Sequence, residues 1–176
     1  MTRDQIAHIP RAAAAITGQT LFVLVGSQAA VLLTDDLPAR MAESVEADLY
    51  PLQHPELADI IDATIGELSL FHDTFGYYAQ GVGPRTAKLP AGWEERARHV
   101  SHPAFAPAIA IVPDLADLCA AKLIAMRPKD LDYVRAALTA GLADTAELAP
   151  RVAAVADVPP EVLAAARAWL ASAGHG

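Results

Sequence analysis

Cysteine, aromatic residues and long apolar runs are all scarce in this sequence of 176 residues. With one cysteine, Cys119, the chain has neither an intramolecular disulfide nor a metal site built from several thiolates, and we expect this residue in the core. No apolar run approaches the roughly 20 residues that span a bilayer. The apolar stretch at residues 11–16 gives way to polar residues 17–20 without a convincing signal-peptide cleavage pattern. We therefore expect a cytoplasmic protein with no membrane partner.

Basic residues are also few, because 13 lysines and arginines face 21 aspartates and glutamates and the formal net charge is −8. This balance argues against passive binding to duplex DNA, whose affinity depends on cations that neutralise phosphates. A local basic site is compatible with the sequence, because several cations lie in its second half: Lys88, Arg96, Arg98, Lys122, Arg127 and Lys129. Hydrophobic residues make up 53% of the chain, which is typical of a folded globular protein. We expect one domain over residues 1–140 and a helical appendage over residues 141–176 packed on it.

Apolar spacing predicts an α/β (α+β) fold with a mixed sheet flanked by helices and with further helices at the C-terminus. Buried or alternating strands are expected at residues 21–25, 44–50 and 108–112, and an antiparallel meander is expected between residues 71 and 100, including residues 77–82. Helices are expected at residues 4–16, with an imperfect start and an interruption at Pro10, and at residues 28–33, 54–65, 114–126, 128–140 and 160–169.

The strand–turn–helix–strand order around Gly26-Ser27 and Glu46-x-Asp48 indicates phosphate and metal chemistry. A glycine lets a phosphate approach the main chain, and a serine at a helix start offers a hydroxyl and free backbone N–H groups. Carboxylates two residues apart on a strand point to one face, where they can share oxygen-ligated Mg²⁺. Each element alone is compatible with a simple turn or a solvated strand face. Their combination favours a nucleotide site.

These residues carry a resemblance to a known superfamily. Residues 25–30 with Arg40 and residues 44–49 resemble the first signature of the polymerase-β-like nucleotidyltransferases. Residues 121–130 resemble the Lys-Leu-x-Ala-x-Arg-x-Lys-Asp segment of nucleotidyltransferase-like proteins that include the abortive-infection toxins. Residues 71–78 and 89–94 are similar to the middle of an uncharacterised branch of that group. The likeness covers about residues 21 to 140 and leaves the C-terminal helices outside.

The resemblance implies transfer of a nucleotide from a nucleoside triphosphate (NTP) to an acceptor, with Mg²⁺ or Mn²⁺ as cofactor. It implies that Glu46 and Asp48 bind the metal and act in catalysis, and that Asp130 supplies a further catalytic carboxylate. It implies that Gly26, Ser27 and Lys122 contact the triphosphate, with Lys122 on the rim of the cleft. The acceptor is left open between tRNA, protein and a small molecule, and the further partner between a cognate antitoxin and a second copy of the chain.

A rival interpretation is a catalytically silent binding or regulatory module that keeps the fold, for instance in a toxin–antitoxin or phage-defence pair. Two departures favour it: Glu46 stands where the family pattern prefers Asp, and the strand at residues 108–112 has no acidic residue. Two residues also have structural interpretations. Lys122 is compatible with a lysine extending from a half-buried helix face, and Asp130 with a carboxylate that stabilises a helix N-terminus.

Overall fold

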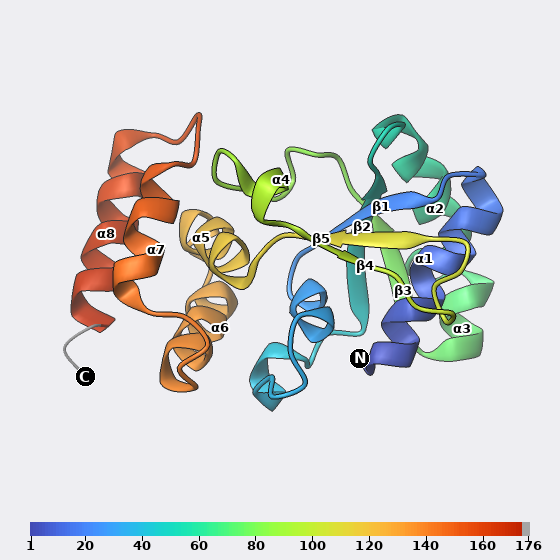
Figure 1. Ribbon diagram of the computed structural model, residues 1–176, viewed down its shortest axis with the longest axis horizontal. Helices are drawn as coiled ribbons and strands as arrows, with labels where there is room; N and C mark the ends of the chain where they lie inside the picture. The colour runs from blue at the N-terminus through green and yellow to red at the C-terminus, as the bar shows by residue number, and fades with distance from the viewer. Residues whose placement is uncertain (174–176) are drawn as a thin grey trace.

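A five-stranded mixed sheet forms the centre of residues 1–173, which the computed structural model describes (Figure 1). Its strands are β1 (Leu21–Val25), β2 (Glu46–Pro51), β3 (Tyr78–Gly81), β4 (Arg98–Val100) and β5 (Ile109–Val112). They lie in the order β3-β2-β1-β5-β4. β1 runs parallel to β5 and antiparallel to β2, β2 runs parallel to β3, and β4 runs antiparallel to β5.

Helices occupy both ends of the view in Figure 1 and make up most of the remaining chain. The α-helices are α1 (Arg3–Thr17), α2 (Ala58–Ile65), α3 (Leu70–Phe75), α4 (Trp93–Arg96), α5 (Leu115–Ala125), α6 (Pro128–Thr139), α7 (Thr145–Ala153) and α8 (Pro160–Ala173). The 3₁₀ helices are η1 (Gln28–Leu32), η2 (Ala39–Met41) and η3 (Pro55–Leu57). These elements confirm the expected α/β (α+β) fold with a mixed sheet and C-terminal helices.

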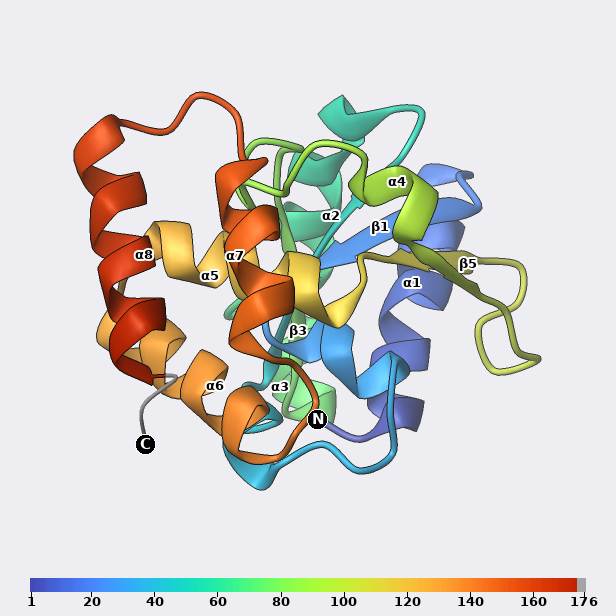
Figure 2. The ribbon, with the colours of Figure 1, turned by 60° about the vertical axis from the view of Figure 1, so that its left-hand side comes forward.

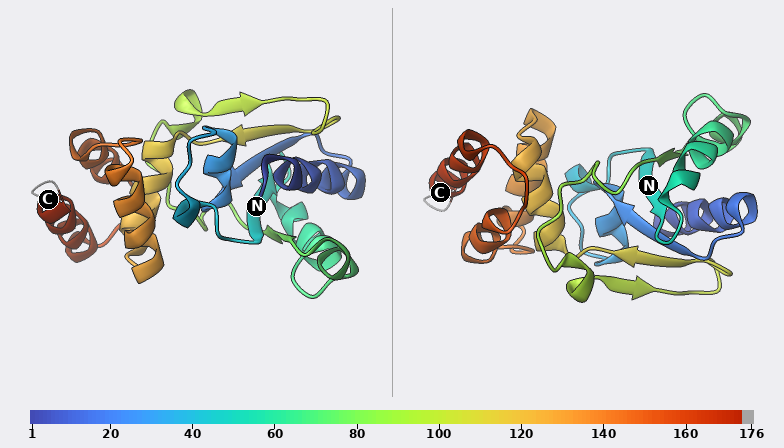
Figure 3. Two further views of the ribbon diagram at one scale, coloured as in Figure 1. Left: turned by 90° about the horizontal axis from the view of Figure 1, so that it is seen from below. Right: turned by 90° about the horizontal axis from the view of Figure 1, so that it is seen from above.

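Helices α1 to α3 gather at one end of the sheet and α5 to α8 at the other, as Figures 1 and 3 show from three directions. Helix α5 packs against α6, α7 and α8, and α8 also packs against α7 (Figure 2). Leu148, Val152 and Leu170 from the last two helices are buried in the same core cluster as Phe22 and Leu24 of β1. Cys119 is fully buried in that cluster, as the sequence predicts.

The opposite face of the sheet is only partly covered. Val23, Val25 and Ile111 form a smaller cluster on this face, against which Leu89 and Trp93 pack. A pocket extends over the first residues of β2 on this face, and the polar side chains at that end of the strand line it. Among residues 1–173, no helix is both long enough and apolar enough to cross a membrane.

The first helix begins more cleanly than the sequence suggests. Thr2 and Gln5 form a reciprocal capping box, in which each side chain accepts a hydrogen bond from the other's backbone N–H. Pro10 is buried inside the helix and does not end it. Because Ile6, Ile9 and Ala13 bury one continuous face, tertiary packing outweighs the backbone hydrogen bond that proline removes.

The predicted meander between residues 71 and 100 is wrong. Residues 70–75 form helix α3, which Ser69 caps by accepting from the His72 N–H and which ends at Gly76 in the left-handed region. Strands β3 and β4 lie at opposite edges of the sheet. β3 pairs with β2, which precedes α2 and α3 in the chain, and β4 pairs with β5, the next strand along the chain, so β3 and β4 do not pair with each other as a meander requires.

Two further helix predictions need correction. Residues 28–32 form the 3₁₀ helix η1 and not an α-helix, and the helix predicted from residue 54 begins as η3 before α2. The other predicted elements are found within a few residues of their expected bounds. They include α5 with Asp114 as its cap, whose side chain accepts from the N–H groups of Ala116 and Asp117.

Candidate active site

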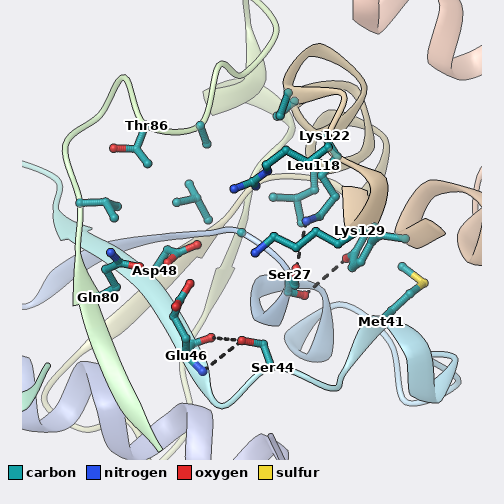
Figure 4. Close-up of a pocket in the computed structure, with 18 of the residues that line it drawn as sticks. Ser27, Met41, Ser44, Glu46, Asp48, Gln80, Thr86, Leu118, Lys122 and Lys129 are labelled. Atoms are coloured by element: carbon teal, nitrogen blue, oxygen red, sulfur yellow. Dashed lines mark hydrogen bonds between the residues drawn. The ribbon is translucent and has the colours of Figure 1, made fainter. Parts of the chain in front are cut away.

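A pocket of about 620 Å³ opens on the exposed part of the sheet face, between the start of β2 and the helices α5 and α6 (Figure 4). The ends of β1, β2 and β3 form one wall, and α5 with the start of α6 forms the other. The pocket brings together five of the residues that the sequence singles out: Gly26, Ser27, Glu46, Asp48 and Lys122. These residues therefore lie close enough together to act on one ligand, and their roles in binding and catalysis stay predictions.

Glycine is required at position 26 both by the backbone conformation there and by the nearby Asp48 side chain. Its φ is +73°, in the left-handed region that side chains disfavour, and a Cβ at this position would overlap the Asp48 carboxylate. The close approach of β2 to the turn after β1 therefore depends on glycine. It places the Asp48 carboxylate directly against the Gly26-Ser27 backbone.

Ser27 precedes η1, and its side chain makes no helix cap. The Ser27 Oγ accepts a hydrogen bond from Lys122 Nζ at 2.9 Å, and the Ser27 carbonyl accepts one from the Tyr133 hydroxyl at 3.4 Å. Only a 3₁₀ helix of five residues follows, so the dipole of a long α-helix does not contribute at this position. The hydroxyl of Ser27 still lines the pocket.

Glu46 and Asp48 point from one face of β2 into the pocket, as the alternation of a strand requires. Burial raises the pKa of Asp48 to about 7, and the negative charge of Glu46 and a hydrogen bond between the two carboxyl groups add to this effect. The positive charges of Lys122 and Lys129 oppose it. Two adjacent carboxylates that resist joint ionisation are a donor set suited to a divalent cation, so the residues present fit Mg²⁺ or Mn²⁺.

Lys122 lies in the wall of the pocket and not on its rim. Its side chain is 10% exposed, and its Nζ donates to Asp130 Oδ1 at 3.3 Å as well as to Ser27. The ammonium also lies 4.3 Å from the centroid of the Tyr133 ring. Burial lowers the pKa of Lys122, and Asp130 counteracts that effect. Lys122 thus holds the Ser27 hydroxyl in place by a hydrogen bond from within the wall.

Asp130 is fully buried and does not line the pocket. Burial acts to raise its pKa, but hydrogen bonds and ion pairs with Arg127 and Lys122 outweigh burial and lower it. Its carboxylate faces those two cations, so its direct contacts are with them and not with a ligand in the pocket. A catalytic function for Asp130 stays a prediction, and any action on the pocket passes through Lys122 or Arg127.

Three further cations, which the sequence pattern alone does not assign to the site, also line the pocket: Arg40, Arg127 and Lys129. Lys129 is exposed and extends across the pocket toward the two carboxylates (Figure 4). Arg127 and Lys129 flank Pro128, which starts α6, in the same motif as Lys122. That motif was the signal available in the sequence, but it does not show which of its cations remain accessible.

The strand β5 is separated from β2 by β1, and none of its residues is acidic. Within residues 1–173, no group of three or more His, Cys, Asp or Glu side chains is arranged to hold a metal ion. Glu43 also lines the pocket, but it is exposed and pairs with Arg40 at 3.5 Å, so the carboxylates that lie side by side in the pocket are those of Glu46 and Asp48.

A family model described as "Nucleotidyltransferase of unknown function (DUF6036)" matches residues 4–167. The chain belongs to this nucleotidyltransferase family. The match extends from α1 into α8, so the expected limit of the likeness at about residue 140 was too narrow. No curated protein and no solved structure matches the chain.

Proposed function

We propose that the protein transfers a nucleotidyl group from an NTP to an acceptor, with Mg²⁺ or Mn²⁺ held by Glu46 and Asp48. The observation that carries this proposal is the meeting of these two carboxylates with Ser27 and Lys129 in one pocket of about 620 Å³. Carboxylates opposite accessible cations match a ligand made of a polyphosphate and a metal ion.

The triphosphate is assigned to the side of the pocket formed by the Gly26-Ser27 turn and the start of α6. There, Lys129 and Arg127 offer accessible cations, and Lys122 fixes the Ser27 hydroxyl. Gly26 lets the Asp48 carboxylate lie against the turn, which places a metal ligand beside this side of the pocket. These groups would orient the triphosphate so that its α-phosphorus lies near the carboxylate pair.

The bound cation would neutralise charge on the departing pyrophosphate and favour loss of the acceptor's proton. In the transfer, an acceptor hydroxyl oxygen forms a bond to the α-phosphorus while the bond between the α-phosphorus and the bridging oxygen breaks. Pyrophosphate leaves, and the hydroxyl proton passes to solvent. Glu46 and Asp48 would hold the ion, and Arg127 and Lys129 at the start of α6 would bind the phosphates.

The rival function is nucleotide binding without transfer. It is favoured because, within residues 1–173, no third acidic or histidine side chain joins Glu46 and Asp48 in a group arranged to hold a metal ion, and Glu43 of the same pocket pairs with Arg40. On this alternative the same pocket binds Mg²⁺·NTP as a regulatory signal. The abortive-infection branch, a cognate antitoxin and the choice among tRNA, protein and small-molecule acceptors stay predictions.

Label transfer tests the proposal and separates it from the rival. The protein is incubated with Mg²⁺ or Mn²⁺, a cell extract and each NTP labelled on either the α- or the γ-phosphate. Nucleotidyl transfer moves the α-label into an acceptor fraction and releases the γ-label as pyrophosphate. Binding of NTP without movement of either label would support the rival, and movement of the γ-label into the acceptor would contradict both.

A further inference from the structure

Strand β3 supplies a second row of polar side chains beside Glu46 and Asp48. It pairs in parallel with β2, with Tyr78 in register with Glu46 and Gln80 in register with Asp48. Residues in register on neighbouring strands point to the same side of the sheet. Tyr78 therefore lies on the face that carries the carboxylates, at the edge of the site.

The Tyr78 hydroxyl donates a hydrogen bond to Glu46 Oε2 at 3.0 Å. The tyrosine is 9% exposed, and its ring lies 4.6 Å from the ring of His72. His72 is held in turn, because its Nδ1 accepts from the Leu68 N–H at 3.1 Å. The Tyr78 side chain of β3 is thus held between the ring of His72 in α3 and one carboxylate oxygen of Glu46.

Glu46 is also fixed at its main chain, where its N–H donates to Ser44 Oγ at 3.1 Å. With both ends of the residue held, the carboxylate has little freedom to rotate. An aspartate at this position would be shorter by one methylene, about 1.5 Å. Its carboxylate would withdraw from the Tyr78 hydroxyl, so the longer side chain at position 46 matches the position of the tyrosine.

We propose that Tyr78 is a positioning residue of the cation site, whose hydroxyl holds one oxygen of Glu46 so that the carboxylate is presented to a divalent cation beside Asp48. The inference rests on the proposed function. Groups that orient a metal ligand from behind contribute tenfold to a hundredfold in metal affinity. Glutamate at position 46 is then part of a working arrangement with tyrosine and not a mark of a weakened site.

The chain offers a matched control for this tyrosine. Tyr77, the preceding residue, is equally buried, and its hydroxyl lies 2.8 Å from Nδ1 of His8, away from the carboxylates. Tyr78→Phe and Tyr77→Phe each remove one partnered hydroxyl and keep the ring. Only the first change alters the surroundings of Glu46.

Binding of Mn²⁺, followed by electron paramagnetic resonance with and without NTP, tests the proposal. Tyr78→Phe should weaken Mn²⁺ binding at least tenfold, whereas Tyr77→Phe should bind as the wild type does. Glu46→Asp should weaken it similarly in the wild type. In the Tyr78→Phe background, Glu46→Asp should weaken Mn²⁺ binding little further, because the hydrogen bond between residues 78 and 46 is already absent.

The outcomes separate this inference from the proposed function. If the wild type binds Mn²⁺, Glu46→Gln abolishes binding and Tyr78→Phe leaves it unchanged, the carboxylate site stands and the inference about Tyr78 is overturned. Additive effects of Tyr78→Phe and Glu46→Asp would overturn it too. If the wild type binds no Mn²⁺ in either condition, the cation site and the inference both fail.

Discussion

At the scale of single residues, the environment of Asp48 in the pocket strongly favours its protonated form. Its pKa of about 7 in the fold lies well above the ordinary value of 3.8. An acid with a raised pKa in the folded state contributes stability that is fully present below its unfolded pKa and lost as the pH rises through its folded pKa. The window for this loss therefore runs from about pH 4 to about pH 7.

The first prediction follows from this sign. In EDTA, raising the pH from 5 to 8 should destabilise the wild type more than Asp48→Asn, by on the order of 2 kcal/mol, because the variant has no charge to bury. Urea unfolding at a series of pH values measures the difference, in which other titrating groups cancel. Parallel curves for the two proteins would show that Asp48 ionises normally.

The two lysines of the pocket should separate stability from binding. Lys122 is buried against Asp130, so Lys122→Met should lower the free energy of unfolding by about 2–4 kcal/mol. Lys129 is exposed, so Lys129→Met should change stability by less than about 0.5 kcal/mol while it weakens NTP binding about tenfold. Urea unfolding and a nucleotide titration of both variants check this. Equal stability of the two variants would contradict the assignment of Lys122 to the wall.

At the scale of elements, a buried ion pair cluster joins three helices. Asp117 of α5 is fully buried and accepts hydrogen bonds from Arg96 of α4 at 2.9 Å and from Arg151 of α7 at 3.0 Å. Burial raises the pKa of Asp117, and the Arg96 guanidinium opposes that rise. The cluster ties the C-terminal helices to the helix that carries Lys122.

Removal of this charge should loosen that attachment. Asp117→Asn should cost about 3 kcal/mol of unfolding free energy, because two arginines lose their buried counter-charge. Asp132→Asn is the matched control, since Asp132 is half-exposed and its pairs with Arg40 and Arg135 should contribute less than about 1 kcal/mol. Urea unfolding compares the two, and similar losses would mean that the cluster is not a structural joint.

Elements with strong local signals could be predicted from the sequence. The apolar run of β1, the Asp114 cap of α5 and Pro128 at the start of α6 each report their own structure through nearby residues. The partner of β3 could not be predicted in this way, because β3 pairs with β2 across the intervening helices α2 and α3, and β4 pairs with β5, which lies outside the segment expected to form the meander. The Ser69 cap of α3 was a local signal that the glycine pattern around it obscured.

The site residues likewise divide into those that local sequence patterns predict and those that tertiary packing positions. Strand alternation was enough to place Glu46 and Asp48 on one face, and the glycine before Ser27 was enough to indicate a turn. The burial of Lys122 and Asp130 follows from the packing of α5 against α6, which neither segment specifies alone. The Tyr78–Glu46 bond requires the parallel register of β2 and β3, so it was not accessible before the sheet was known.

At the scale of the whole molecule, a nucleotidyltransferase family fold surrounds a pocket in which acidic and basic groups face each other. At one end of the sheet, α3 and β3 lie behind Glu46. At the other end, α5 lies behind Ser27. The fold therefore holds the two sides of the site from opposite directions. On the proposed function, Glu46 and Asp48 at the centre of this pocket bind a cation together with an NTP.

Thermal unfolding of the wild type and of Glu46→Gln/Asp48→Asn, with and without Mg²⁺ and each of the four ribonucleotides, tests that claim most directly. A ligand at a hundredfold excess over its Kd stabilises the folded state by about 2.7 kcal/mol. For a chain of this length, that corresponds to a rise in Tm of roughly 5–10 °C. The wild type should show this rise with at least one Mg²⁺·NTP, and the double variant should show none while it melts at the same or a higher temperature without ligand. Equal shifts in both proteins, or no shift of the wild type with any nucleotide, would contradict the claim.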